Sequence, residues 1–233
     1  TSAGAAVKSV SLSLNPSFSP IGIGQRWRIF AAAAFLVSVP VFFEAPLVRH
    51  LPLLAVALSV GWLGLAQVLR SREQSQIWGD LLIGFTGSWL AGAIYWGWFR
   101  WEPMLHLPLE AIGLPVALWC LWRGQLAIGS WFYLGSLFGT TVTDVYFYVV
   151  NLIPHWRQLM QVEPELAIPI FQNAIALVNT PWGCGWAAVL GILLLSVGSL
   201  PLRSSELKWW AFGGAVLSTI VVDSLFWLAA LAA

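Results

Sequence analysis

Charged residues are scarce in this sequence, where Asp, Glu, Lys and Arg make up only 9% of 233 residues. A typical soluble domain has about a quarter. The net charge is +1 and the basic residues are scattered, which excludes an extended nucleic-acid-binding surface. Hydrophobic residues account for 59% of the chain. We therefore expect an integral membrane protein whose main surroundings are the lipid bilayer, with no nucleic-acid partner.

Cysteines are few, and the common catalytic motifs are absent. Cys120 and Cys184 are the two cysteines, and their spacing is not that of a metal knuckle or a redox pair. The motifs GxSxG, HExxH and GxxxxGK[ST] do not occur. The last apolar run has no deep lysine, which excludes an ordinary retinal Schiff base. The sequence predicts no metal site and leaves open whether the protein is an enzyme.

Long apolar runs, each able to cross about 30 Å of hydrocarbon as a helix, predict an all-α polytopic bundle of about seven spans. Residues 1–26 are expected to form a cytoplasmic tail and residues 27–233 a single transmembrane domain. The segment Leu166–Leu200 is interrupted at 179–181 (Asn, Thr, Pro), which predicts a kinked helix or an interfacial piece followed by a span. The other expected spans are Trp27–Val48, Leu51–Leu69, Ile77–Phe99, Leu105–Trp122, Leu126–Ile153 and Leu207–Ala233.

The distribution of cations predicts the orientation of these spans, because cytoplasmic loops carry more Lys and Arg. Seven spans with a cytoplasmic N terminus place eight of the eleven cations inside. A separate crossing by Leu166–Val178 would reduce the bias to six against five, so we expect seven spans and an outer, lumenal or periplasmic C terminus. The inner cations are Lys8, Arg26, Arg28, Arg70, Arg72, Arg123, Arg203 and Lys208, and the outer ones are Arg49, Arg100 and Arg157.

Tryptophan is abundant, with sixteen residues, many of them near the ends of the expected spans, including Trp96 and Trp156 on the outer side. Belts of aromatic rings at the two membrane interfaces explain this placement. A surface that binds pigment or quinone is the alternative, because it would use aromatic rings as well. The cofactor is therefore unknown, with chlorophyll or carotenoid as candidates.

Ionisable residues inside the expected spans lie mostly toward the outer side. All three histidines, His50, His106 and His155, fall there. Acids are tolerated on the translocated side, but a charge well inside an apolar helix costs a few kcal/mol and usually faces the bundle interior. Four acids need such an explanation: Glu44, Glu110, Asp144 and Asp223.

His106 and Glu110 are four residues apart at the start of the fourth expected span, with Pro108 suited to a first helical turn. Residues at this spacing share one helix face. We interpret them as a structural ion pair or cap, with a metal or pigment site as the alternative. Two ligands without a third at fixed spacing are a weak metal signal.

Polar residues recur along the fifth expected span at Thr140, Asp144, Tyr148 and Asn151. These intervals of four, four and three draw a stripe on one side of an apolar helix, which should face protein. The sequence GSLFG at 135–139 has the small-xxx-small spacing of closely packed membrane helices. We expect close packing at the glycines and a buried polar network around Asp144.

Two blocks, FLVSVPVFFEAPLVR (35–49) and FGTTVTDVYFYVVNLIPHWRQLMQVEP (138–164), carry a resemblance that covers nearly the whole chain. On these blocks the chain resembles an uncharacterised family of polytopic membrane proteins of cyanobacteria, classed as a domain of unknown function. The resemblance implies a thylakoid or plasma membrane of a photosynthetic cell. It implies no activity, cofactor or catalytic residue.

Two functions follow as hypotheses. The first is an accessory subunit or assembly factor of a larger, photosynthetic membrane complex, with pigment or lipid held on the Trp-rich surface. The second is a membrane-embedded enzyme or transporter that acts on a lipid, isoprenoid, proton or metal ion, and it requires the outer-side acids to converge. The candidate cofactor-binding residues are His106, Glu110, His50 and His155, and the candidate intramembrane centre is Glu44, Asp144, Asp223 and Tyr148.

Overall fold

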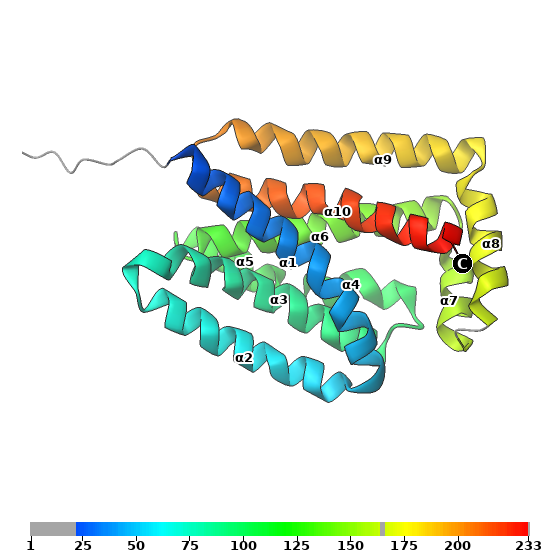
Figure 1. Cartoon of the computed structure of the whole chain (residues 1–233), viewed down its shortest axis with the longest axis horizontal. Coiled ribbons are helices and arrows are strands. Elements are labelled where there is room, and N and C mark those ends of the chain that lie inside the picture. The colour runs from blue at the N-terminus through cyan, green and yellow to red at the C-terminus, as the bar shows by residue number, and fades with distance from the viewer. Residues whose placement is uncertain (1–21, 164–165, 233) are drawn as a thin grey trace, which may run out of the picture.

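The computed structural model describes residues 22–163 and 166–232, and the regular structure in these ranges is helical (Figure 1). This confirms the predicted all-α bundle. The α-helices are α1 (Ile23–His50), α2 (Pro52–Arg70), α3 (Gln76–Trp98), α4 (His106–Glu110), α5 (Leu114–Trp122), α6 (Ala127–Val149), α7 (Ile153–Gln161), α8 (Ala167–Val178), α9 (Pro181–Ser199) and α10 (Leu207–Ala232).

Six segments are long and apolar enough to cross a membrane: α1, α2, α3, the segment Pro103–Trp122 that contains α4 and α5, α9 and α10. Helix α6 joins α7 through a bend of 100°, and the two together reach the same length and apolarity. The described part of the chain thus holds six candidate spans, or up to seven with α6, in agreement with the number predicted from the apolar runs.

The two ends of the bundle differ. Helices α7 and α8 lie across one end, where α1, α3 and α6 finish and α4 begins, and we call this the α7–α8 end (Figure 1). The described chain starts at the opposite end, while α10 finishes at the α7–α8 end. The described residues thus begin and finish at opposite ends of the bundle, which agrees with an odd number of spans. The assignment of the α7–α8 end to the outer side stays a prediction.

Helices α1, α3, α6 and α10 form the interior of the bundle, and α2, α5 and α9 pack on its outside. The glycines of GSLFG let α6 approach α10 closely, as the spacing predicts. A Cβ atom at Gly135 would lie 2.7 Å from the carbonyl oxygen of Phe212, and one at Gly139 would overlap Thr219. Small residues thus replace side-chain interdigitation at this contact.

Large apolar side chains cover the outside of the bundle. Leu53 on α2 is 75% exposed, Phe43 on α1 is 69% exposed and Ile192 on α9 is 63% exposed. A soluble protein does not present such continuous apolar faces to water. Their exposure is what a helical bundle surrounded by lipid requires.

The structure corrects several predicted boundaries. Helix α1 begins at Ile23 rather than Trp27, so the expected tail is shorter, and residues 1–21 of it lie outside the described ranges. Helix α6 ends at Val149, before the predicted Ile153, because Asn151 adopts a left-handed backbone with φ of 61°. The chain then turns into α7, which places the following residues across the end of the bundle.

The fourth and sixth predicted spans are both interrupted. The predicted span Leu105–Trp122 is present as the apolar segment Pro103–Trp122, but a 3-10 turn, η3 (Ala111–Gly113), separates α4 from α5 within it. Pro108 and Pro115 each lack an amide hydrogen, which favours such a break. Between Leu166 and Leu200 the chain forms α8, which lies across the end beside α7, and then α9 as a span (Figure 1).

Candidate functional site

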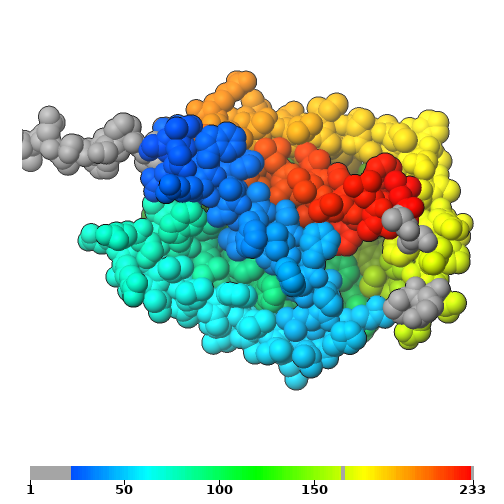
Figure 2. Space-filling view, in the orientation of Figure 1, coloured from blue at the N-terminus to red at the C-terminus, as the bar shows by residue number. Residues whose placement is uncertain are grey.

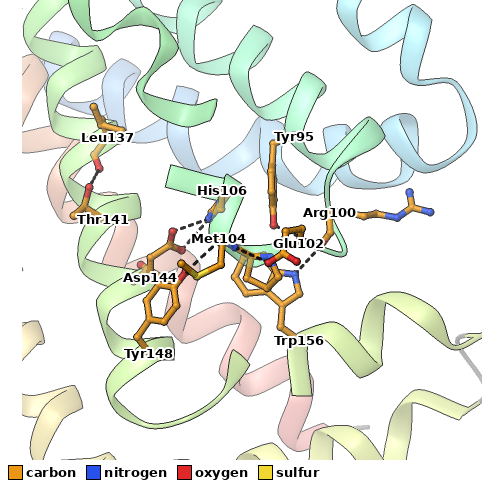
Figure 3. Close-up of polar contacts among 12 residues, drawn as sticks. Tyr95, Arg100, Glu102, Met104, His106, Leu137, Thr141, Asp144, Tyr148 and Trp156 are labelled. Carbon is orange, nitrogen blue, oxygen red and sulfur yellow. Dashed lines mark hydrogen bonds and ion pairs between the residues drawn. The ribbon is translucent and has the colours of Figure 1, made fainter. Parts of the chain in front are cut away.

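A buried histidine and aspartate form the centre of the α7–α8 end. The Nδ1 atom of His106, at the start of α4, lies 2.8 and 3.0 Å from the two carboxylate oxygens of Asp144 on α6 (Figure 3). The two residues are 8% and 4% exposed. An acid at this depth in an apolar bundle needs such a partner. The packing of α4 against α6 supplies it.

Aromatic rings surround the His106 imidazole. Its centroid lies 4.4 Å from that of Tyr95, 5.6 Å from that of Trp96 and 5.3 Å from that of Trp156. The two indoles stack on each other with an angle of 5° between their planes. The indole nitrogen of Trp156 donates to the carbonyl of Arg100 at 2.9 Å (Figure 3). The histidine is therefore fixed in position by rings from α3 and α7.

Two further carboxyl groups meet over a glycine of α3. A Cβ atom built at Gly92 would lie 3.3 and 3.5 Å from the two carboxylate oxygens of Glu44 on α1. The same point lies 3.6 Å from Oε1 of Glu110 on α4. The missing side chain at Gly92 thus leaves a space that two acids share. Among the described residues, the buried Oε1 atom of Glu44 has no hydrogen-bond partner.

Electrostatic interactions connect these groups with one another. Glu44 interacts with Glu110, and Glu110 interacts with both His106 and Asp144. Asp223 on α10 interacts with Asp144. We call these five residues the carboxyl–histidine centre. It draws on four helices that are far apart in the sequence.

Thr143 attaches Asp223 to α6. Its hydroxyl donates a hydrogen bond of 2.9 Å to Oδ2 of Asp223. Because Thr143 directly precedes Asp144 in the chain, the same helical turn serves both acids. The centre thereby extends from α4 across α6 to α10.

The predicted polar stripe on α6 is only partly formed. Asp144 is buried as expected, but Tyr148 is 43% exposed and Asn151 lies beyond the helix in an exposed turn. The hydroxyl of Tyr148 lies 3.4 Å from the carbonyl of Pro103. His106 bonds to Asp144 rather than to Glu110, so the predicted pairing within α4 was wrong.

The three histidines do not converge. His50 is exposed at the end of α1. His155 is half-buried on α7, and its Nδ1 atom has no hydrogen-bond partner among the described residues. Neither makes a described polar contact with His106. The proposal that these residues share a cofactor therefore gains nothing from their positions.

Several residues of the site were not predicted from the sequence. Trp96 and Trp156 were predicted to lie in interfacial belts, and their packing on His106 at the α7–α8 end was not foreseen. Tyr95 is fully buried, and nothing in its neighbourhood distinguishes it from a core aromatic. Gly92 lies in the small run Ala-Gly-Ala of α3, which was a weak signal of close approach.

Tyr133 on α6 supports the break between α4 and α5. Its hydroxyl donates to the carbonyl oxygen of Glu110 and accepts from the amide of Gly113 at 3.1 Å. These are backbone groups that the interrupted helix leaves without their usual partners. Because they are satisfied, Glu110 is held where its side chain reaches the space over Gly92.

An acid elsewhere on α3 has a different environment. The carboxylate of Asp80 accepts from the amide of Ile128 at 3.2 Å and from that of Gly129 at 3.1 Å. These amides belong to the first turn of α6, where the helix dipole favours a negative charge. Asp80 therefore caps α6 and is not part of the carboxyl–histidine centre.

The chemistry of the centre is that of carboxyl and imidazole groups. Over residues 22–163 and 166–232, no three His, Cys, Asp or Glu side chains are placed to bind one metal ion. Carboxyl and imidazole groups bind and release protons at physiological pH when their surroundings allow it. Several of them in electrostatic contact within an apolar bundle could pass or store a proton.

The fold and the site together define a class of protein. It is an all-helical integral membrane protein with ionisable groups gathered inside one end of its helical bundle. Within that class, the chain belongs to the family described as Protein of unknown function (DUF3120), whose model matches residues 33–231. The match includes the whole carboxyl–histidine centre and confirms the resemblance to a family of unknown function. No curated protein and no solved structure matches the chain.

Proposed function

We propose that the protein is a membrane transporter in which the carboxyl–histidine centre binds and releases protons. One observation carries this proposal: Glu44 and Glu110 share the space over Gly92, where Oε1 of Glu44 is buried without a described partner. Convergence of the acids was the condition that this function had to meet. A purely structural acid would be satisfied as Asp80 is.

The closeness of the two glutamates favours proton exchange. Two ionised carboxylates near each other repel strongly in an interior of low dielectric constant. A proton on either of Glu44 and Glu110 removes that repulsion. The charge state of the pair is therefore coupled to proton binding, which is what a proton-dependent transporter uses.

The His106–Asp144 pair supports the same function. Asp144 holds the imidazole through Nδ1, which leaves Nε2 as the nitrogen able to exchange a proton. Glu110 lies four residues from His106 on α4 and interacts with it electrostatically. The pair thus lies beside the glutamates, linked to them through Glu110 on the same short helix.

Charge movement after a pH jump tests this function. The purified protein is reconstituted into vesicles on a solid-supported membrane, and the transient current is recorded when the external pH is changed. We expect a transient from the wild type that falls by about tenfold or more in the Glu44→Gln and Glu110→Gln double variant, because neither amide titrates.

Asp80→Asn is the matched control, because it removes an acid of α3 that lies outside the carboxyl–histidine centre and is already satisfied by backbone amides. Its current should equal that of the wild type. A wild-type protein without a transient, or a double variant with an undiminished one, contradicts the proposal. Size-exclusion chromatography of each variant establishes that it is folded.

A second function, the accessory subunit, has one observation in its favour. Gly61 and Gly64 are exposed on α2, and Cβ atoms built there would meet no other atom within 4 Å. Small residues on an outward face allow a foreign helix to approach closely. We propose for this function a photosynthetic complex in a cyanobacterial thylakoid or plasma membrane, with chlorophyll or carotenoid against exposed rings such as Trp122 and Trp182.

Native gels after mild detergent extraction test the accessory function. Co-migration with a large complex is expected, together with an absorption band from any bound pigment. The variant Gly61→Leu with Gly64→Leu should release the chain from the complex, because leucine side chains would keep a partner helix away. A wild-type chain found only as a pigment-free monomer contradicts this function.

A further inference from the structure

A cavity of about 360 Å³ opens at the α7–α8 end of the bundle. It lies between the last turns of α1 and α3 on one side and α7 and α8 on the other. In the space-filling view, the end of α1 and the α7–α8 segment lie toward the right of the molecule (Figure 2). The cavity is separate from the space over Gly92.

Two arginines line this cavity, Arg49 at the end of α1 and Arg100 just after α3. Neither guanidinium has an ion pair or a hydrogen bond with any described residue. Arg157 at the same end differs, because it binds Oε1 of Glu102 at 2.8 Å. The side chain of Arg100 points away from the site around His106 (Figure 3). Two arginines without an ionic partner among the described residues therefore face one cavity.

The rest of the lining is largely apolar. It includes Val48 from α1, Trp96 from α3, Met160 from α7 and Phe171 from α8. A site for a small soluble anion would not need such walls. A cavity with two cations and an apolar lining, placed where membrane helices end, matches a molecule with a charged head and a hydrocarbon tail.

We infer that this cavity binds an anionic lipid, with its phosphate held between Arg49 and Arg100 and its hydrocarbon against Trp96 and Phe171. Guanidinium groups bind phosphate oxygens with two parallel hydrogen bonds, which gives both strength and orientation. The hydrocarbon would fill the space between the end of the spans and the crossing helices α7 and α8. The lipid would thus hold these two helices against the bundle.

This inference goes beyond the proposed function and does not depend on it. Neither arginine belongs to the carboxyl–histidine centre, so lipid can occupy the cavity whether or not the protein moves protons. Trp96 is the residue common to both places, since it lines the cavity and its ring lies 5.6 Å from that of His106.

Native mass spectrometry of the purified full chain tests lipid binding. The protein in detergent is mixed with equal amounts of phosphatidylglycerol, which is anionic, and phosphatidylcholine, which has no net charge. We expect the wild type to retain phosphatidylglycerol in preference by about tenfold or more, because each arginine near the headgroup adds to the attraction. The Arg49→Gln and Arg100→Gln double variant should lose this preference.

Arg157→Gln is the control, because it removes one cation from the same end but outside the cavity lining, and it should leave the preference unchanged. Either single arginine variant should lose part of it, which gives a measurement even if the double variant fails to fold. Equal retention of both lipids by the wild type overturns the inference. Displacement of phosphatidylglycerol by millimolar inorganic phosphate also overturns it, because the cavity would then bind the free anion.

Discussion

Asp80 and Glu44 are both acids inside apolar helices, yet their surroundings are opposite. The carboxylate of Asp80 accepts two amide hydrogens from the first turn of α6. Glu44 has a buried oxygen without a described partner and a second acid, Glu110, across the same space. Depth in the membrane alone therefore does not distinguish a functional acid from a structural one. What distinguishes them is whether backbone amides already bind the carboxylate.

Two glycines of α3 produce these two environments. Gly84 brings the backbone of α3 against Gly129 of α6, which places the amides of α6 within reach of Asp80. Gly92, two turns further along, faces side chains instead of backbone and leaves room for two carboxyl groups. One helix thus uses the same residue type once for close packing and once to leave a space.

The largest effect is expected from Gly84→Val. A Cβ atom at this position would overlap the backbone carbonyl of Gly129, which cannot move away without separating α3 from α6. We expect a loss of several kcal/mol and little or no monodisperse protein. Expression yield and size-exclusion profile measure this. A variant that purifies like the wild type would show that the contact between the two backbones is not needed.

The next effect is expected from Gly92→Ala, which changes the space between the glutamates. The added methyl group would lie 3.3 to 3.6 Å from carboxylate oxygens at the ends of flexible side chains, so the protein should fold. The methyl group would separate Glu44 from Glu110 and weaken their sharing of a proton. We expect the pH-jump current to fall several-fold with a nearly unchanged thermal midpoint. An unchanged current would remove Gly92 from the site.

A smaller effect is expected from Asp80→Ala, which removes the cap from α6. Loss of a helix cap costs about 1 to 2 kcal/mol, or a lowering of the thermal midpoint by several degrees in a chain of this size. The pH-jump current should persist, in contrast to Gly92→Ala. Thermal unfolding in detergent and the current are measured on the same preparation. A variant that keeps its stability but loses its current would reverse the comparison.

The smallest effect is expected at Glu102, which lies outside the spans. Hydrogen bonds from the Arg157 guanidinium and the Met104 amide hold the pKa of its carboxyl below its usual value of 4.5. A lowered folded-state pKa means that the contribution to stability is fully present above about pH 4.5 and is lost as the pH falls through the lowered pKa.

The variant Glu102→Gln tests this dependence. Because the pair is exposed, we expect its thermal midpoint at about pH 7 to lie only about a degree below that of the wild type. The difference should shrink as the pH at which both proteins are measured is lowered below about 4.5. A difference that persists at acidic pH would mean that Glu102 acts through packing and not through its charge.

The apolar runs predicted the spans well, because the length needed to cross a bilayer is a property of each run alone. The same reasoning recognised Asp144 as a buried polar residue. It failed to find its partner, because helical periodicity relates residues only within one helix and therefore pointed from His106 to Glu110. The bond to Asp144 joins residues 38 positions apart, and it depends on how α4 packs against α6.

The meeting of Glu44 with Glu110 could not be predicted for a similar reason. It requires the register of three helices, α1, α3 and α4, to bring two side chains over Gly92. Trp96 and Trp156 were placed at membrane interfaces because the ends of spans are the usual position of tryptophan. The 100° bend after α6 also brings Trp156 onto His106, a contact that the expected position at an interface does not predict.

The short 3-10 turn η3 has a consequence for the angular phase of its span. A 3-10 helix turns about 120° per residue, whereas an α-helix turns about 100°. Over the three residues Ala111–Gly113, α5 is therefore rotated by roughly 60° relative to the direction that a continuous helix would give it. This offset lets Glu110 face the interior while Trp122, 80% exposed, points outward from the same span.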